Sequence, residues 1–317
     1  MPSTQRLGSG KLVAVTFSQL RALEAVARTG NVTRAAEDLG ITQPAISHSL
    51  QALERELGAT LLVRRSSGVM LTALGREVSA RASLILRELQ GIRQHAAVAR
   101  GMGEGKLRLG VIPSVNARLL PNVLRSFAVA QPNIKLAVLE GSDGEVLEWL
   151  RTGAIDVATV ADAAEDLDTT ALARDELLAI LPSDHPLAQE DTVSIADLAG
   201  EPFIMSSGGC EPLIRAIATG SHVNLRSHYH VGDTNSIVSM VAEHLGVSVM
   251  PELAIPGRRP QITAVPLRPR EFRELSLAVL RDCSALPAAV TFIEHASSMH
   301  PDHLRPPGDL VVRARVA

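Results

Sequence analysis

A segment near the N-terminus carries polar side chains whose types and spacing suit recognition of nucleic acid. Amide, hydroxyl and imidazole groups hydrogen-bond to the edges of base pairs, and guanidinium groups pair with phosphates. At about 100° per residue, these side chains point away from the apolar stripe of the same predicted helix. The polar face consists of Pro44, Ser47, His48, Gln51 and Arg55, and the stripe of Ile46, Leu50, Leu53 and Leu57. The alternative is ordinary solvent-exposed polar surface.

Three segments after residue 105 place hydroxyl and backbone N–H groups at the starts of predicted helices. Such positions suit an anion, because the N-terminus of a helix carries a partial positive charge. A carboxylate is the favoured ligand, and the alternative is simple N-capping. The segments are Pro113-Ser114-Val115, Ser206-Ser207-Gly208-Gly209-Cys210 and Thr234.

Cys210 also offers thiol chemistry, since a helix N-terminus lowers the pKa of a thiol. Cys210 is then either a redox sensor or a small residue that lines a pocket, and its spacing from Cys283 does not support a disulfide. His228 and His230 share one face of a predicted strand and, with His222 or Cys210, form a weak candidate for a metal site; the alternative is a polar strand face. The sequence contains no glycine-rich nucleotide loop, HExxH or GxSxG motif, so we predict no enzyme, no catalytic residue, no metal and no cofactor.

Short helices must position the first polar face. Apolar residues recur at helical spacing from Phe17, and a tight turn at Gly40-Ile41 joins the second helix to the third, as in a helix-turn-helix. The segments 60–63 and 69–71 flank a basic tip and predict a small hairpin, or wing. The predicted N-caps are Thr16 or Ser18, Asn31 and Thr42, and the predicted helix ends are Gly30, Gly40 and Gly58.

A long helix is predicted from Thr72 to about Arg100. Its apolar residues alternate in steps of four and three, a heptad pattern that favours dimerisation over packing within one domain. The seam comprises Val78, Ala82, Ile85, Leu89, Ile92, Ala96 and Ala99.

After a glycine-rich break at 101–105, apolar strand-like runs alternate with helical segments. This order predicts an α/β domain of two lobes, joined by crossover strands, with a cleft between them. Strands are predicted at 106–112, 134–140, 155–160, 177–181, 203–206, 227–231, 247–250 and 275–279, and helices at 117–130, 143–151, 211–218, 236–244 and 288–298. The segment 301–317 is predicted to be a disordered tail.

Composition agrees with a folded protein of about two domains in a reducing compartment. The 317 residues include 46% hydrophobic and 21% charged residues and only two cysteines. No apolar run is long enough for a membrane span, and no signal core is present, so we expect a cytoplasmic protein. Residues 1–100 carry 13 Lys and Arg against 7 Asp and Glu, whereas the rest carries 18 against 27. A basic first third suggests a module that binds a polyanion.

The segment from Phe17 to Gly75 resembles the winged helix-turn-helix of LysR-type transcriptional regulators. The resemblance rests on Gln19-Leu-Arg, Gly30-Asn-Val-Thr-Arg-Ala-Ala36, Leu39-Gly-Ile-Thr-Gln-Pro-Ala-Ile-Ser47, Leu57-Gly58 and Leu61-Leu-Val-Arg-Arg65. The order of the elements also matches the family. The resemblance implies a DNA-binding domain at 16–75, a linker and dimerisation helix at 72–100, and an effector-binding domain resembling periplasmic binding proteins at 106–300.

The resemblance also implies which residues meet DNA. Gln43, Pro44, Ser47 and His48 would lie on or near base edges, although the family often has Arg where this sequence has His48. Thr33, Arg34 and Arg64 would hold phosphates, and the tip Ser67-Gly68 would enter the minor groove. The complete set is Thr33, Arg34, Thr42, Gln43, Pro44, Ser47, His48, Gln51, Arg64, Arg65, Ser67 and Gly68.

As partners, the resemblance implies double-stranded DNA with an interrupted inverted repeat, a homodimer through the linker helix, a homotetramer, and RNA polymerase, with no membrane. A small-molecule effector would bind between the lobes, and Cys210 is the site for the redox alternative. A periplasmic solute-binding protein is the remaining alternative. The effector-binding set is Ser114, Val115, Ser206, Ser207, Gly208, Gly209, Cys210 and Thr234.

Overall fold

A computed structural model describes residues 15–65, 68–99, 105–161, 164–257, 259–281 and 285–299. The chain divides into two compact units, Met1–Ile92 and Arg93–Ala317. The predicted tail, Ser67 and Cys283 lie outside the described residues. Within the described part, no helix is both long and apolar enough to cross a membrane.

The first unit begins with three helices, α1 (Phe17–Thr29), α2 (Val32–Leu39) and α3 (Gln43–Leu57). Each ends at a predicted glycine in the left-handed conformation, which costs a residue without Cβ little. The side chains of Thr16 and Asn31 accept backbone N–H groups as caps, as predicted. Thr42 occupies the third N-cap position, but its side chain makes no capping hydrogen bond.

The apolar stripes of these helices meet in one core. Leu23, Ile46 and Leu53 are fully buried there, together with Leu61 from the segment that follows α3. Leu57 was predicted to belong to this core, but 38% of its surface is exposed. It is the last residue of α3, beyond the reach of the neighbouring helices.

The predicted wing is an antiparallel hairpin of β1 (Leu62–Arg65) and β2 (Gly68–Leu71). The predicted long helix follows as α4 (Ala73–Ala99). Along its predicted seam Ala82 is buried, whereas Ile85 and Ile92 are 46% and 66% exposed. This exposure leaves an apolar stripe on the helix.

The second unit contains a six-stranded sheet with the strand order β4-β3-β5-β10-β6-β9. Parallel pairing joins β3 to β4 and to β5, as the alternation of strands and helices predicts, whereas β10 is antiparallel to its neighbours β5 and β6. A separate parallel pair consists of β7 and β8. The strands are β3 (Gly105–Val111), β4 (Ile134–Glu140), β5 (Val157–Val160), β6 (Leu167–Pro182), β7 (Phe203–Ser206), β8 (Ser227–Val231), β9 (Ser248–Pro251) and β10 (Ile262–Leu280).

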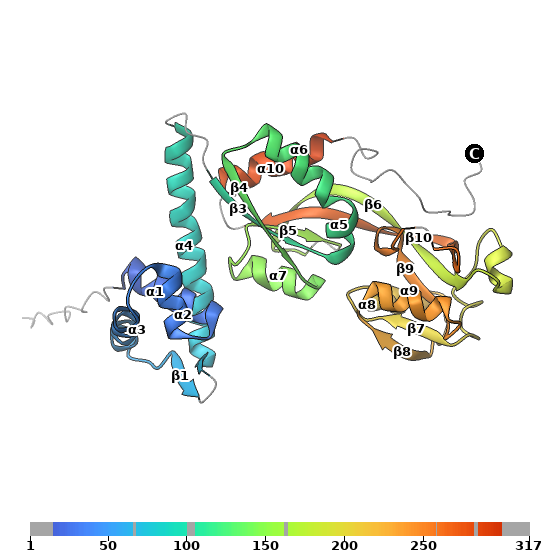
Figure 1. Ribbon diagram of the computed structural model, residues 1–317, viewed down its shortest axis with the longest axis horizontal. Coiled ribbons are helices and arrows are strands. Elements are labelled where there is room, and N and C mark those ends of the chain that lie inside the picture. Colours follow the sequence, from blue (N-terminus) through green and yellow to red (C-terminus); the bar gives the residue numbers. More distant parts are fainter. Residues whose placement is uncertain are drawn as a thin grey trace, which may run out of the picture. The chain divides into compact units, whose positions relative to one another are not determined.

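Two lobes share this sheet through its long strands (Figure 1). Lobe I contains β3, β4 and β5, with α6 and α10 on one face and α7 on the other, and lobe II contains β7, β8, β9, α8 and α9. Each lobe has its own apolar core. The helices are α5 (Pro113–Arg118), α6 (Leu120–Ala130), α7 (Asp143–Arg151), α8 (Glu211–Gly220), α9 (Thr234–Ala242) and α10 (Pro287–Ser298), with the 3-10 turns η1 (Pro186–Gln189) and η2 (Glu252–Ala254).

Three predicted elements differ from the structure. The strands predicted at 177–181 and 275–279 are parts of the much longer β6 and β10, in which the first half of β6 and the middle of β10 are largely exposed and lack a continuous apolar run. The helix predicted at 117–130 is two helices, α5 and α6, that meet at Leu119. Pro121 lies in the first turn of α6, where a proline suits the start of a new helix.

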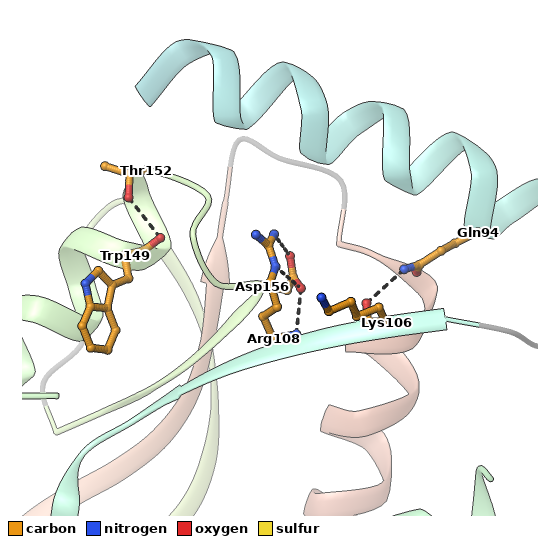
Figure 2. Close-up of polar contacts among 6 residues, drawn as sticks. All are labelled: Gln94, Lys106, Arg108, Trp149, Thr152 and Asp156. Carbon is orange, nitrogen blue, oxygen red and sulfur yellow. Dashed lines mark hydrogen bonds and ion pairs between the residues drawn. The ribbon is translucent and has the colours of Figure 1, made fainter. Parts of the chain in front are cut away.

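Buried polar contacts fix the beginning of β3 (Figure 2). Arg108 makes a bidentate ion pair with Asp156, at 2.6 and 3.1 Å, and its backbone N–H donates to the same carboxylate. Asp156 is fully buried, so its charge requires these donors. Nearby, the amide nitrogen of Gln94, near the end of α4, donates to the carbonyl of Lys106 at 3.2 Å. These contacts join the last turns of α4, and the residue immediately before β5, to β3.

Candidate functional site

The polar face of α3 is on the surface of the first unit. Gln43, Pro44, His48 and Gln51 are exposed and Ser47 is half-buried, while Ile46 and Leu50 on the opposite face are buried. The side-chain amide of Gln43 lies 3.5 Å from the hydroxyl of Ser47, so the two groups are neighbours on this face. The predicted polar face is therefore presented to solvent on a rigid helix.

The turn before α3 sets the angle at which this face is displayed. Gly40 adopts φ +66°, and the N–H of Ile41 donates back to the carbonyl of Ala36. On α2, Thr33 and Arg34 are exposed beside the capping oxygen of Asn31, which accepts both of their backbone N–H groups. Thr33 and Arg34 therefore lie at the fixed first turn of α2.

A carboxylate joins α3 to the wing. Glu54 Oε1 accepts the backbone N–H groups of Leu61 and Leu62, at 2.7 and 3.1 Å. At the other side of the wing, Gly68 has φ +132°, and a Cβ there would lie 2.7 Å from the carbonyl oxygen of Gly30. Arg64 and Arg65 belong to β1, but their side chains, like Ser67, lie outside the described part of the structure.

The second unit has a cavity of about 340 Å³ between its lobes. Its walls come from the start of α5, the ends of β4 and β7, the starts of α7, α8 and α9, and the segment around η2. A volume of this size suits a small organic molecule. Five of the predicted residues line it: Ser114, Ser206, Gly208, Cys210 and Thr234.

The other three predicted residues do not line the cavity. Val115, on α5, is fully buried, because its side chain belongs to the apolar core of lobe I. Ser207 is exposed outside the lining, with its backbone N–H donated to the carbonyl of Val231. Gly209 is not part of the lining, but its backbone lies close to the carboxylate of Asp143, which is.

A buried ion pair forms part of the wall. Arg273 on β10 donates to Asp175 on β6 at 2.7 and 2.9 Å, and its Nη2 also donates to Ser114 Oγ at 2.6 Å. Asp175 is fully buried and accepts the N–H of Leu253 as well. The pair joins the two crossover strands to α5 and η2 where the lobes meet.

Further charged side chains line the cavity, and the sequence analysis did not identify them. Arg118 donates to the carbonyl of Ile255 at 2.6 Å. Hydrogen bonds from the side chain and backbone of Ser236 hold the pKa of Asp233 below its usual range. These charges lie at helix and strand ends and, for Arg273, within β10, and only the tertiary structure brings them together. They are Arg118, Glu140, Asp143, Asp233 and Arg273.

The surroundings of Cys210 act against the lowered thiol pKa that its position at a helix N-terminus suggests. Burial raises the pKa of the Cys210 thiol; the Arg273 charge opposes this rise, while Asp143 and Asp175 add to it. Desolvation of the charged form is the largest of these influences.

The histidines of β8 are used in local contacts. His228 Nδ1 accepts the N–H of Phe203 at 3.3 Å, and His230 Nε2 lies 2.8 Å from Ser227 Oγ. Among the described residues, no group of three or more His, Cys, Asp or Glu side chains is arranged to hold a metal ion.

Comparisons with known proteins cover both units. The family model described as "Bacterial regulatory helix-turn-helix protein, lysR family" matches residues 17–76, and "LysR substrate binding domain" matches residues 100–300. An uncharacterized HTH-type transcriptional regulator, YvbU of Bacillus subtilis, is 31% identical over 90% of this chain and 99% of its own length.

Two further comparisons, one with a curated relative and one with a solved structure, cover most of the chain. The hydrogen peroxide-inducible genes activator of Haemophilus influenzae is 30% identical over 80% of this chain and 86% of its own length. Full-length OxyR of Pseudomonas aeruginosa has the same fold, with a TM-score of 0.73 at 24% identity over 90% of this chain and 99% of that one.

Proposed function

The chain belongs to the LysR family of DNA-binding transcriptional regulators, and on this premise we propose that α3 reads the bases of an operator while the inter-lobe cavity binds the controlling effector. One observation carries the first part: Gln43, Ser47 and His48 form a solvent-exposed polar face on a helix anchored by buried Ile46 and Leu50. A single helix fits the major groove, where base pairs present distinct donors and acceptors.

Each residue of this face has a role in the proposal. Gln43 pairs with adenine through its amide, Pro44 contacts a thymine methyl group, and Ser47 and His48 hydrogen-bond to neighbouring base edges. Thr33 and Arg34, together with residues of the wing, hold phosphates and set the register without reading sequence. Loss of the Gln43 amide costs about 1–3 kcal/mol of discrimination.

Two copies of the chain pair through the exposed apolar stripe of α4 in this proposal. Ile85 and Ile92 supply apolar area that is buried when a second α4 packs against it. A two-fold dimer presents two α3 helices and therefore selects an interrupted inverted repeat. Two dimers form a tetramer on the operator, and the bound regulator then contacts RNA polymerase.

The effector is a small molecule with a carboxylate, held in the cavity between the lobes. The guanidinium groups of Arg118 and Arg273 and the hydroxyl groups of Ser114, Ser206 and Thr234 support this assignment. The effector shifts the equilibrium between two arrangements of the lobes only if it binds one of them more tightly than the other. We infer that closure of the lobes changes how the subunits pair and how the operator bends.

Selection from a pool of random duplexes tests base recognition. The full-length protein is expected to enrich an interrupted inverted repeat, and Gln43→Ala to lose preference at one position of each half-site. Ser49→Ala is the matched control, because Ser49 is half-buried on the same helix outside the predicted contacts. A Gln43→Ala protein that enriches the same repeat as the wild type would refute the proposed role of α3.

Oxidation of Cys210 is the second candidate function. It is favoured by the position of Cys210 in the cavity wall and by similarity to a peroxide-inducible activator, and it is opposed by the raised thiol pKa. If the thiol is the sensor, Cys210→Ser abolishes the response of a reporter gene to hydrogen peroxide. An unchanged response in Cys210→Ser would exclude it.

A further inference from the structure

The inter-lobe cavity has walls of both charge signs, with carboxylates in excess. Glu140, Asp143 and Asp233 contribute negative charges, and Arg118 and Arg273 positive ones. The charge of Arg273 is already matched by fully buried Asp175, to which it donates two hydrogen bonds. The other charged residues of the lining are Arg118 and these three carboxylates, so the cavity offers partners to a positive group of a ligand as well as to a negative one.

Ser206 indicates where a ligand group hydrogen-bonds. Its residue surface is only 6% exposed, and it lines the cavity. A hydroxyl in a cavity wall can donate a hydrogen bond to a bound molecule. The hydroxyl suits a carboxylate oxygen of the ligand, and Arg118 lines the same cavity.

Asp143 lies where a cationic group would act on both lobes. It is the first residue of α7 in lobe I, and its Oδ2 lies so near Gly209 of lobe II that a Cβ on that glycine would be 2.3 Å from it. Gly209 has φ +118°, a conformation that glycine adopts readily, so the loop can approach the carboxylate. A cation at Asp143 therefore lies at the seam between lobe I and the loop 206–210.

From this arrangement we propose that the effector is a zwitterion of the amino-acid class, whose protonated amine pairs with Asp143 and Glu140 while its carboxylate meets Ser206 and Arg118. The inference rests on the proposed effector role of the cavity and specifies the ligand for it. Both charges of such a ligand find partners of opposite sign in the lining, whereas an acid without an amine gains no ion pair with Asp143 or Glu140. The amine is thus the group that distinguishes the effector from other small carboxylates.

Matched probes test this on the full-length protein. The common L-amino acids, their N-acetyl derivatives and the corresponding amine-free carboxylic acids are screened by thermal shift, and hits are titrated by calorimetry. At least one free amino acid is expected to raise the unfolding temperature, with its N-acetyl and amine-free partners binding at least about tenfold more weakly. This comparison needs no variant, so it stands even where a substitution disturbs folding.

Two variants assign the effect to the cavity. Asp143→Asn is expected to weaken the amino-acid hit by about tenfold and to leave its amine-free partner within about twofold. Glu148→Gln changes an exposed carboxylate of the same helix outside the cavity lining and is expected to bind like the wild type. Equal loss in both variants would overturn the role of Asp143.

The outcomes separate this inference from the proposed function. Hits confined to acids without an amine overturn the zwitterion and leave the cavity as an effector site. The zwitterion is also overturned if a hit binds as tightly without its free amine as with it, and as tightly to Asp143→Asn as to the wild type. Absence of binding by every compound in all three sets counts against the zwitterion and against the cavity as a carboxylate-binding effector site together.

Discussion

The carboxylate of Glu54 accepts the backbone N–H of Leu61 at 2.7 Å, and this contact joins the end of α3 to the base of the wing. Glu54 Oε1 accepts the N–H of Leu62 as well, so one side chain satisfies two donors at the start of β1. Because α3 is proposed to enter the major groove, the position of the wing relative to that groove depends on this contact.

Glu54→Ala leaves these two N–H groups without their acceptor. Hydrogen bonds to a charged group contribute about 1.5–3 kcal/mol, so we expect a destabilisation of that order and weaker operator binding. Chemical denaturation and fluorescence anisotropy with a labelled duplex measure the two effects. Glu37→Ala, at an exposed position on α2, is the control and is expected to retain stability. Stability equal to the wild type in Glu54→Ala would show that the contact contributes nothing.

Arg34→Ala removes a proposed phosphate contact at the first turn of α2. Binding to all duplexes is expected to weaken to a similar extent, because phosphate contacts carry no sequence information. The slope of log affinity against log salt is expected to fall in magnitude by about 0.9 per lost contact. Titrations at several salt concentrations measure it. Arg125→Ala, exposed on α6 of the second unit, serves as the control; an unaltered slope in Arg34→Ala would argue against a phosphate contact.

The double variant Ile85→Glu/Ile92→Glu places charges on the exposed stripe of α4. A packed pair of helices would have to bury these carboxylates, so the dimer is expected to dissociate while each chain stays folded. Analytical ultracentrifugation gives the mass, and circular dichroism reports the fold. Glu88→Gln, an exposed change on the same helix, is expected to leave the mass unchanged. A double variant that sediments with the wild-type mass would locate the dimer contact elsewhere.

Asp175→Asn leaves the guanidinium of Arg273 buried without its anion. Breaking one partner of a buried ion pair costs about 3–5 kcal/mol, and we expect a loss of this size in the free energy of unfolding. Adding Arg273→Met removes the stranded charge, so the double variant is expected to recover part of the loss. Denaturant unfolding of the single and double variants measures the coupling. A double variant that is less stable than Asp175→Asn would contradict this account.

Acid unfolding reports on the cap of α9. Hydrogen bonds from Ser236 lower the pKa of Asp233 below its ordinary value of 3.8, so the ionised carboxylate favours the folded state. This contribution is complete above the ordinary value and is lost as the pH falls through the lower, folded pKa. Asp233→Asn keeps a capping side chain without the charge. The wild type is expected to be slightly more stable than Asp233→Asn at pH ~7, and the difference to vanish in strong acid. A difference that is independent of pH would refute the ionised cap.

Local chemistry made the first unit predictable from the sequence. Glycines that can adopt positive φ end α1, α2 and α3, and the caps Thr16 and Asn31 lie at the predicted positions. Similarly, β4 and α7 have the predicted boundaries because their periodicities are uninterrupted. The predicted burial of Leu57 was wrong, because an apolar side chain does not by itself reveal whether another element covers the end of its helix.

The cleft was only partly predictable. Ser114, Ser206 and Thr234 were found because hydroxyl groups at strand-to-helix junctions are visible in the sequence. Val115 was assigned wrongly, since its inward direction follows from how α5 packs. The charged residues of the cavity lining were not predicted, because residues such as Arg118 and Arg273 are far apart in the sequence and belong to no common motif.

The sequence by itself determined the winged helix-turn-helix, the polar face of α3 and the alternation of strands with helices, because periodicity, caps and turns act over a few residues. Only the tertiary structure decided which charges share the cavity and in which direction the pKa of Cys210 is shifted there. Electrostatic energies depend on distance and desolvation, and both are set by chain segments that are remote in sequence. For this reason burial raises the pKa of the Cys210 thiol, although a helix N-terminus by itself would lower it, and the thiol is near an ion pair that no local sequence pattern indicates.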